Sequence, residues 1–200
     1  DSHVGYGMPI GGVLATAGVV IPNAVGVDIG CGVSVVQTPV TDIDTGAIKQ
    51  IMGRVREAIP VGFAHHKDKQ DKALLPPLEA IHPAITSAEY QRAQYQIGTL
   101  GGGNHFWELQ RGGDGHLWVM IHSGSRNLGY RTANHYNEIA TALNKRWHVA
   151  VPIEWQLTFL PLDSDEGQAY LADMNYCVDF ALANRRLMMQ RTLDIIADVC

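Results

Sequence analysis

Four side chains of types that bind transition metals lie beside glycines or apolar, strand-like runs. Asp28 and Cys31 are three positions apart in Val-Gly-Val-Asp-Ile-Gly-Cys-Gly-Val, residues 25–33, and His105 and His122 follow much later. A thiolate favours soft or borderline cations and a carboxylate favours harder ones, so this mixed set suits a transition metal better than calcium. The wide spacing excludes a short zinc-finger pattern, so the fold itself must bring these residues together.

Each of these residues also has a purely structural explanation. The D-x-x-C pattern alone more often marks a buried cysteine beside a turn-capping aspartate. His105 and His122 are equally compatible with strand-end or core histidines. Glycines 101–103 let backbone N–H groups approach a phosphate, but they match neither a P-loop nor a dinucleotide-binding fingerprint. Ser-Gly-Ser-Arg at residues 123–126 is typical of an anion cradle or of an ordinary polar turn.

Short strands must position these residues. Valine and isoleucine favour extended backbone, and glycine permits sharp bends, so we expect residues 25–33 to form a strand that bends sharply. Apolar or alternating runs predict further strands at residues 12–16, 18–21, 33–38, 105–109 and 117–121. The last two lie on either side of a glycine-rich turn and are expected to pair as a hairpin.

Helical spacing predicts four helices around these strands. We expect the first to start at Thr41, whose hydroxyl caps it, and to end before Pro60. The second starts at Thr86 with a T-x-x-E capping box, and two long helices follow from residues 128 to 147 and from about Asp163 onward. The predicted fold is α+β, with mixed strands and hairpins forming a central metal pocket flanked by long helices.

The composition is that of a soluble globular protein, with 46 % hydrophobic and 18 % charged residues. No apolar run approaches the ~20 residues that span a bilayer, so we expect no membrane segment. The net charge of −5 gives no global attraction to nucleic acid but does not exclude a local basic patch. Three widely spaced cysteines fit a reducing compartment, and we expect a cytoplasmic protein.

Long motif runs occur in one order, including G-T-L-G-G-G-N-H-F at residues 98–106 and H-S-G-S-R-N-L-G at residues 122–129. Together with residues 1–12, 25–32 and 166–189, they resemble the RtcB-type RNA-splicing ligases over nearly the whole chain. The resemblance implies one incomplete RtcB-like catalytic domain, residues 1–200, truncated at both ends.

The resemblance implies an enzyme of tRNA splicing and RNA repair. Such ligases join RNA ends carrying a 3′-phosphate or a 2′,3′-cyclic phosphate to 5′-hydroxyl ends. They use GTP and two Mn²⁺ ions, with Zn²⁺ as an alternative in crystals, and form a guanylylated histidine that would lie outside this chain. Whether an archease-like activator is a partner stays open.

The resemblance also implies a role for each motif residue. Cys31 would bridge the two metal ions, His105 would bind one ion, and Asp28 and His122 would bind the other. The implied catalytic residues are Cys31, Asn104 and His105.

The guanylate would contact Asn104, His105 and Glu108, and Arg126 with neighbouring hydroxyls would face phosphate. Asp1 and His3 would lie at the pocket edge, with no role assigned.

Two alternatives use the same metal-binding residues. One is a catalytically incomplete metal-binding module, or truncated paralogue, that binds RNA ends or a partner. The other is a metal-dependent hydrolase.

Overall fold

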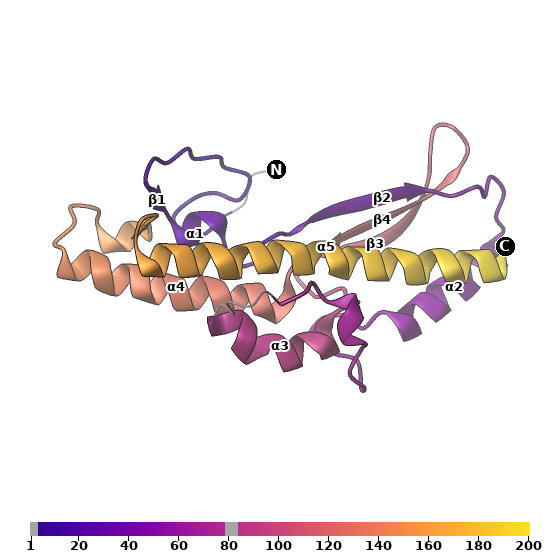
Figure 1. The fold of residues 1–200 in the computed structure, drawn as a ribbon. Helices are drawn as coiled ribbons and strands as arrows, with labels where there is room; N and C mark the ends of the chain where they lie inside the picture. The colour runs from indigo at the N-terminus through magenta and orange to yellow at the C-terminus, as the bar shows by residue number, and fades with distance from the viewer. Residues whose placement is uncertain (1–3, 79–83) are drawn as a thin grey trace.

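The long helix α5, Asp165–Val199, runs along the elongated molecule, and the other elements lie beside it (Figure 1). The structure is a computed structural model that describes residues 4–78 and 84–200. Ser164 caps α5 by accepting a hydrogen bond from the Gly167 N–H. Buried side chains such as Phe180 and Met188 recur at helical spacing, so α5 packs against both the sheet and the other long helices.

A three-stranded antiparallel sheet lies against one side of α5 in the order β2-β4-β3. Its strands are β2 Gly32–Gln37, β3 Phe106–Arg111 and β4 Leu117–Ser123. The strand predicted at residues 33–38 and the predicted hairpin are confirmed. Alternate residues Leu117, Val119 and Ile121 are buried in the core with α2 and α5, which places His122 on the opposite face.

The remaining elements of the described residues surround this frame. The helices are α1 Pro22–Val25, α2 Thr45–Ala58, α3 Ala84–Gln96 and α4 Arg126–Arg146, with 3₁₀ turns η1 Lys72–Leu74 and η2 Ile153–Trp155. A second, two-stranded antiparallel sheet pairs β1 Val19–Val20 with β5 Leu160–Pro161. The predicted α+β class with long flanking helices is confirmed. None of the described helices, α5 included, combines the length and apolar character needed to span a bilayer.

The strand predicted over residues 25–33 is wrong. Pro22 opens the short helix α1, which is followed by a turn, and extended structure starts only at Gly32. Gly26 and Gly30 have φ values of 91° and 74°, which reverse the chain where β-branched neighbours alone would favour a strand. The strand predicted at residues 12–16 is also wrong, and that at 18–21 is reduced to Val19–Val20.

The two predicted caps are wrong because other carboxylates supply them. Helix α2 begins at Thr45, and Asp44, not Thr41, accepts the hydrogen bond of the Ala47 N–H at 2.7 Å. Thr86 lies inside α3, where its N–H and hydroxyl both donate to the buried carboxylate of Asp173 on α5. A tertiary contact from distant sequence therefore replaces the local capping box.

Candidate functional site

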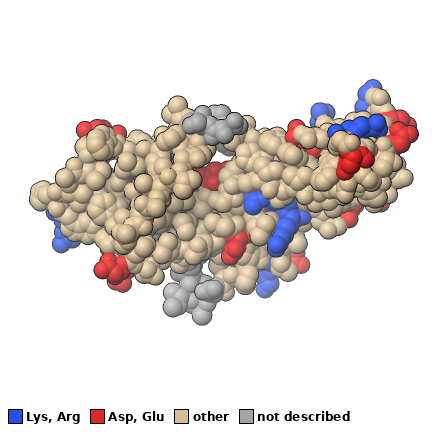
Figure 2. Space-filling view, turned by 90° about the horizontal axis from the view of Figure 1, so that it is seen from above, with Lys and Arg blue, Asp and Glu red and all other residues tan. Residues whose placement is uncertain are grey.

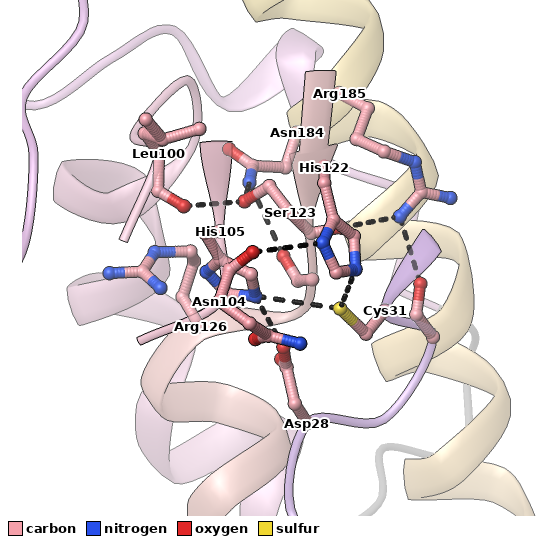
Figure 3. Close-up of polar contacts among 12 residues, drawn as sticks. Asp28, Cys31, Leu100, Asn104, His105, His122, Ser123, Arg126, Asn184 and Arg185 are labelled. Atoms are coloured by element: carbon pink, nitrogen blue, oxygen red, sulfur yellow. Dashed lines mark hydrogen bonds and ion pairs between the residues drawn. The ribbon is translucent and has the colours of Figure 1, made fainter. Parts of the chain in front are cut away.

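The four predicted metal-binding side chains come from separate segments that meet at one end of the sheet (Figure 3). Asp28 lies in the turn after α1, Cys31 directly precedes β2, His105 directly precedes β3, and His122 lies near the end of β4. Cys31 Sγ is 3.4 Å from His105 Nε2 and 3.1 Å from His122 Nε2. Asp28 Oδ2 is 2.6 Å from His105 Nε2. These four residues are called the ligand cluster below.

Backbone geometry sets the positions of the ligand cluster. The Cys31 N–H donates to the Asp28 carbonyl at 3.0 Å, which closes the turn between them. Gly30 lies so close to α5 that a Cβ would be 2.8 Å from the Val178 Cα. On the sheet, His122 pairs with Val33 of β2 and with Phe106 of β3. The turn and the strand register together place the thiol beside the imidazole of His122.

A backbone carbonyl determines which nitrogen of His122 carries the proton. His122 Nδ1 is 3.1 Å from the carbonyl oxygen of Asn104. A carbonyl oxygen only accepts, so in the neutral imidazole Nδ1 donates and Nε2 keeps its lone pair. That lone pair faces the Cys31 sulfur. Metal-bound histidines are oriented in the same way, with the second ring nitrogen bonded to a carbonyl or carboxylate.

His105 presents the same nitrogen, Nε2, to both Asp28 and Cys31. Its side chain is 6 % exposed, whereas that of Asp28 is 33 % exposed. The other nitrogen, Nδ1, is buried beside Gly101, where a Cβ would be 2.5 Å away, and it has no hydrogen-bond partner among the described residues. A cation is therefore reached from His105 through Nε2.

The surroundings shift the pKa values of Asp28 and Cys31 in opposite directions. Burial alone would raise the pKa of Asp28, but hydrogen bonds from His105 and Cys31 outweigh it and hold this pKa below its usual value. Burial, together with the Asp28 charge, raises the pKa of the Cys31 thiol to about 12. A thiolate and a carboxylate in contact repel each other, so ionising Cys31 requires added positive charge nearby.

The donor atoms of the cluster fit a divalent transition metal. Ligand atoms of Asp28, Cys31 and His105 lie within 4.8 Å of one another, and Nε2 of His122, which is outside this group of three, is 3.1 Å from the same sulfur. A cation between them would relieve the repulsion of thiolate and carboxylate and would use the free lone pair of His122. Sulfur, imidazole and carboxylate together favour zinc, manganese or a related ion over calcium.

A cavity of about 550 Å³ opens beside the cluster, lined by residues of segments 4–12 and 23–31 with Asn104 and His122. Asp28 and Cys31 line it directly, and Asp28 is the one carboxylate among the lining residues that the structure describes. Figure 2 shows a hollow near the middle of the upper face in which acidic atoms are visible. The cavity gives a ligand access to the cluster. Asp1 and His3, expected at its edge, lie outside the described residues.

Of the residues predicted to contact nucleotide, Asn104 lines this cavity, whereas His105, Glu108 and Arg126 are not among its lining residues. Asn104 is exposed and lines it. Glu108 lies on β3, on the sheet face that also carries Phe106 and His122, and accepts a hydrogen bond from Gln110 at 2.6 Å. Phe106 and His122 have ring centroids 5.4 Å apart, so this face continues from the cluster along the sheet.

Arg126 hydrogen-bonds to one side chain and one backbone carbonyl of the protein. It donates to the Thr99 hydroxyl at 3.1 Å and to the Gly62 carbonyl at 3.0 Å. Its φ of 58° is left-handed, which costs energy for a residue other than glycine and is common at functional sites. The neighbouring hydroxyl of Ser123 is buried and donates to the Leu100 carbonyl, and Ser125 is buried as well.

Sequence reasoning missed Asn184 and Arg185 of α5, which contact the backbone of the cluster segments. They lie within a mostly apolar stripe that includes Phe180 and Met188. Polar residues inside a helical apolar stripe are the signal that identifies such contacts, because burying them without partners is unfavourable.

Comparison with known proteins places the chain in a family. The family model described as tRNA-splicing ligase RtcB matches residues 1–82 and 76–200. The chain belongs to this family. Its RtcB relatives include the tRNA-splicing ligase RtcB of Thermococcus kodakarensis, 32 % identical over 94 % of this chain and 49 % of the relative.

Two RNA-splicing ligases RtcB from bacteria are similar to the same extent. That of Mycobacterium bovis is 33 % identical over 99 % of this chain and 57 % of the relative. That of Escherichia coli K12 is 31 % identical over 100 % of this chain and 52 % of the relative. The chain thus spans about half the length of the curated RtcB relatives it matches.

Proposed function

We propose that this RtcB-family chain carries the metal centre of a GTP- and Mn²⁺-dependent RNA ligase. The ligase would join 3′-phosphate or 2′,3′-cyclic phosphate ends to 5′-hydroxyl ends. The observation that carries the proposal is the convergence of Asp28, Cys31, His105 and His122 beside an open cavity. The names of the relatives, RNA-splicing and tRNA-splicing ligases, support RNA as the substrate class.

Cys31 is proposed to bridge two Mn²⁺ ions, with His105 on one ion and Asp28 and His122 on the other. The position of the sulfur between two imidazole nitrogens, at 3.4 and 3.1 Å, supports this role. Bound divalent ions would neutralise charge on the reacting phosphate and align the two RNA ends. The protein groups hold the donor atoms in place, and the Asn104 carbonyl selects the tautomer of neutral His122 whose lone pair is on Nε2.

The guanylate is proposed to lie over the sheet face next to the cluster. Asn104 offers an exposed amide at the cavity, and Glu108 offers a carboxylate on the same face as Phe106. An amide and a carboxylate suit hydrogen bonds to a base and its ribose, and an aromatic ring suits stacking. Arg126 is proposed to supply positive charge near phosphate. Its guanidinium lies beside Gly101 in the glycine loop, residues 98–103, and this location supports the role.

Ligation, metal content and GTP binding together separate this proposal from its alternatives. Because the guanylylated histidine would lie outside this chain, the chain is fused to the remaining part of an RtcB relative and incubated with Mn²⁺ and labelled RNAs bearing a 2′,3′-cyclic phosphate and a 5′-hydroxyl, with and without GTP. Joined RNA that depends on GTP supports the ligase, and hydrolysis of the cyclic phosphate without GTP supports the hydrolase. Bound metal, measured by mass spectrometry, with neither product and with no GTP binding supports a metal-binding module.

Metal binding is expected to strengthen as pH rises. Because its pKa is raised to about 12, the Cys31 thiol is protonated at neutral pH and must lose a proton when it binds a cation. Asp28, whose pKa is lowered, is already ionised and adds no proton to this exchange. Between pH 7.5 and 8.5, displacement of one proton predicts a Kd about tenfold lower per pH unit.

Calorimetry in buffers of different ionisation enthalpy measures the protons released on binding. About one proton per chain is expected to be released when the wild type binds metal between pH 7.5 and 8.5. Metal binding without proton release would contradict a thiolate ligand.

A further inference from the structure

Two adjacent polar residues are buried at the middle of α5, directly behind the ligand cluster (Figure 3). Asn184 is fully buried and Arg185 is 9 % exposed. An amide and a guanidinium in such surroundings are tolerated only when hydrogen bonds replace water. Their hydrogen bonds go to the segments that carry the cluster.

Asn184 joins the segment before His105 to the segment after His122. Its Oδ1 accepts from the N–H groups of Gly98 and Thr99 at 2.7 and 3.1 Å. Its Nδ2 faces the Thr99 carbonyl at 3.1 Å, the Ser123 hydroxyl at 3.2 Å and the Gly124 carbonyl at 3.3 Å. One side chain thus sets how far the glycine loop stands from the end of β4.

Arg185 joins the Cys31 segment to the His122 segment through a single nitrogen. Its Nη1 donates to the Gly30 carbonyl and to the Ser123 carbonyl, both at 2.8 Å. Gly30 immediately precedes Cys31, and Ser123 immediately follows His122. The guanidinium also lies against Gly32, where a Cβ would be 3.6 Å from Arg185 Cζ. This one group therefore fixes the thiol relative to the imidazole.

We propose that Asn184 and Arg185 are positioning residues that hold the thiol and the two imidazoles at metal-binding distances. Both hydrogen-bond to the ligand segments only through backbone and Ser123, and the positive charge of Arg185 in addition acts to lower the pKa of the Cys31 thiol. The inference rests on the proposed metal-binding function. It goes beyond a general packing role because the bonds converge on residues adjacent to Cys31 and His122, and on the start of the loop that leads to His105.

The test compares these residues with matched buried residues elsewhere. Asn184→Asp is paired with Asn144→Asp, since Asn144 is 3 % exposed and bonds the backbone of Phe159 far from the cluster. Arg185→Met is paired with Arg191→Met, because Arg191 is part-buried on the same helix and donates to the Ala58 carbonyl. Arg185→Lys serves as rescue, because one ammonium can donate to both carbonyls that Nη1 reaches.

Two measurements are made on every variant, namely the Kd for Co²⁺ by absorption titration and the melting temperature without metal. Asn184→Asp and Arg185→Met are expected to weaken Co²⁺ binding about 10- to 100-fold. This is the usual effect of removing a group that orients a metal ligand without binding the metal itself. Arg185→Lys should retain most of the affinity. The control variants should lose melting temperature with no change in Kd.

Wild-type affinity in both Asn184→Asp and Arg185→Met overturns the inference, as does equal weakening in the controls. If the wild type binds no Co²⁺, the proposed function fails. Backbone hydrogen exchange, measured without metal, then tests the positioning role independently. Faster exchange confined to residues 28–34 and 121–125 in Arg185→Met, relative to Arg191→Met, supports positioning. Unchanged exchange in those segments rejects it.

Discussion

Replacing Cys31 with alanine is expected to abolish tight metal binding. The sulfur is the atom that both His105 Nε2 and His122 Nε2 approach, so its loss removes the donor shared by the two sides of the cluster. The decrease in affinity should exceed the roughly 10- to 100-fold effect of an outer partner. Titration with Co²⁺ or Mn²⁺ measures it, and the stabilisation of the protein by saturating metal should disappear in parallel.

The matched control is Cys200→Ala, because Cys200 is also an exposed free cysteine but does not belong to the cluster. It should bind metal as the wild type does. Without metal, Cys31→Ala should be about as stable as the wild type, since the residue is exposed overall and belongs to none of the hydrophobic core clusters. Full metal affinity in Cys31→Ala would remove the thiol from the proposed centre and leave Asp28 with the two histidines.

The sequence indicates which side chains meet, because residues of metal-binding types lie beside glycines and strand-like apolar runs. Asp28, Cys31, His105 and His122 were each singled out on this basis, and the structure brings them within hydrogen-bonding distance. The hairpin was predicted well for the same reason, since alternation in β4 continues over seven residues. Strong local patterns were sufficient for these parts of the fold.

Local patterns failed where distant residues decide the structure. Thr86 fits a capping box, yet Asp173, far along the chain, takes both its N–H and its hydroxyl. Residues 25–33 have strand-like composition, yet glycines with positive φ and the close approach of α5 produce a turn. The positions of Asn184 and Arg185 in the sequence do not indicate that they contact the cluster segments. These contacts depend on the packing of α5 behind the sheet.

Gly124→Ala is expected to disrupt the cluster without changing any ligand. A Cβ at Gly124 would overlap the carboxylate of Asp28, which must then move. Asp28 is 33 % exposed, so its side chain can turn toward solvent, away from His105. The chain should therefore stay folded with a small loss of melting temperature, while affinity for Mn²⁺ falls at least about tenfold, as when a ligand is misplaced.

The matched control is Gly53→Ala in helix α2, where a new Cβ meets nothing within 4 Å. It should raise stability by up to about 1 kcal/mol, because alanine favours the helix, and leave metal affinity unchanged. A double-mutant cycle identifies the cause of the loss in Gly124→Ala. If the added methyl acts only by displacing the carboxylate, it should weaken binding no further in a chain that already carries Asp28→Ala. Additive losses would instead mean that the methyl disturbs the cluster through the backbone of β4, and the displacement of Asp28 would be rejected as the mechanism.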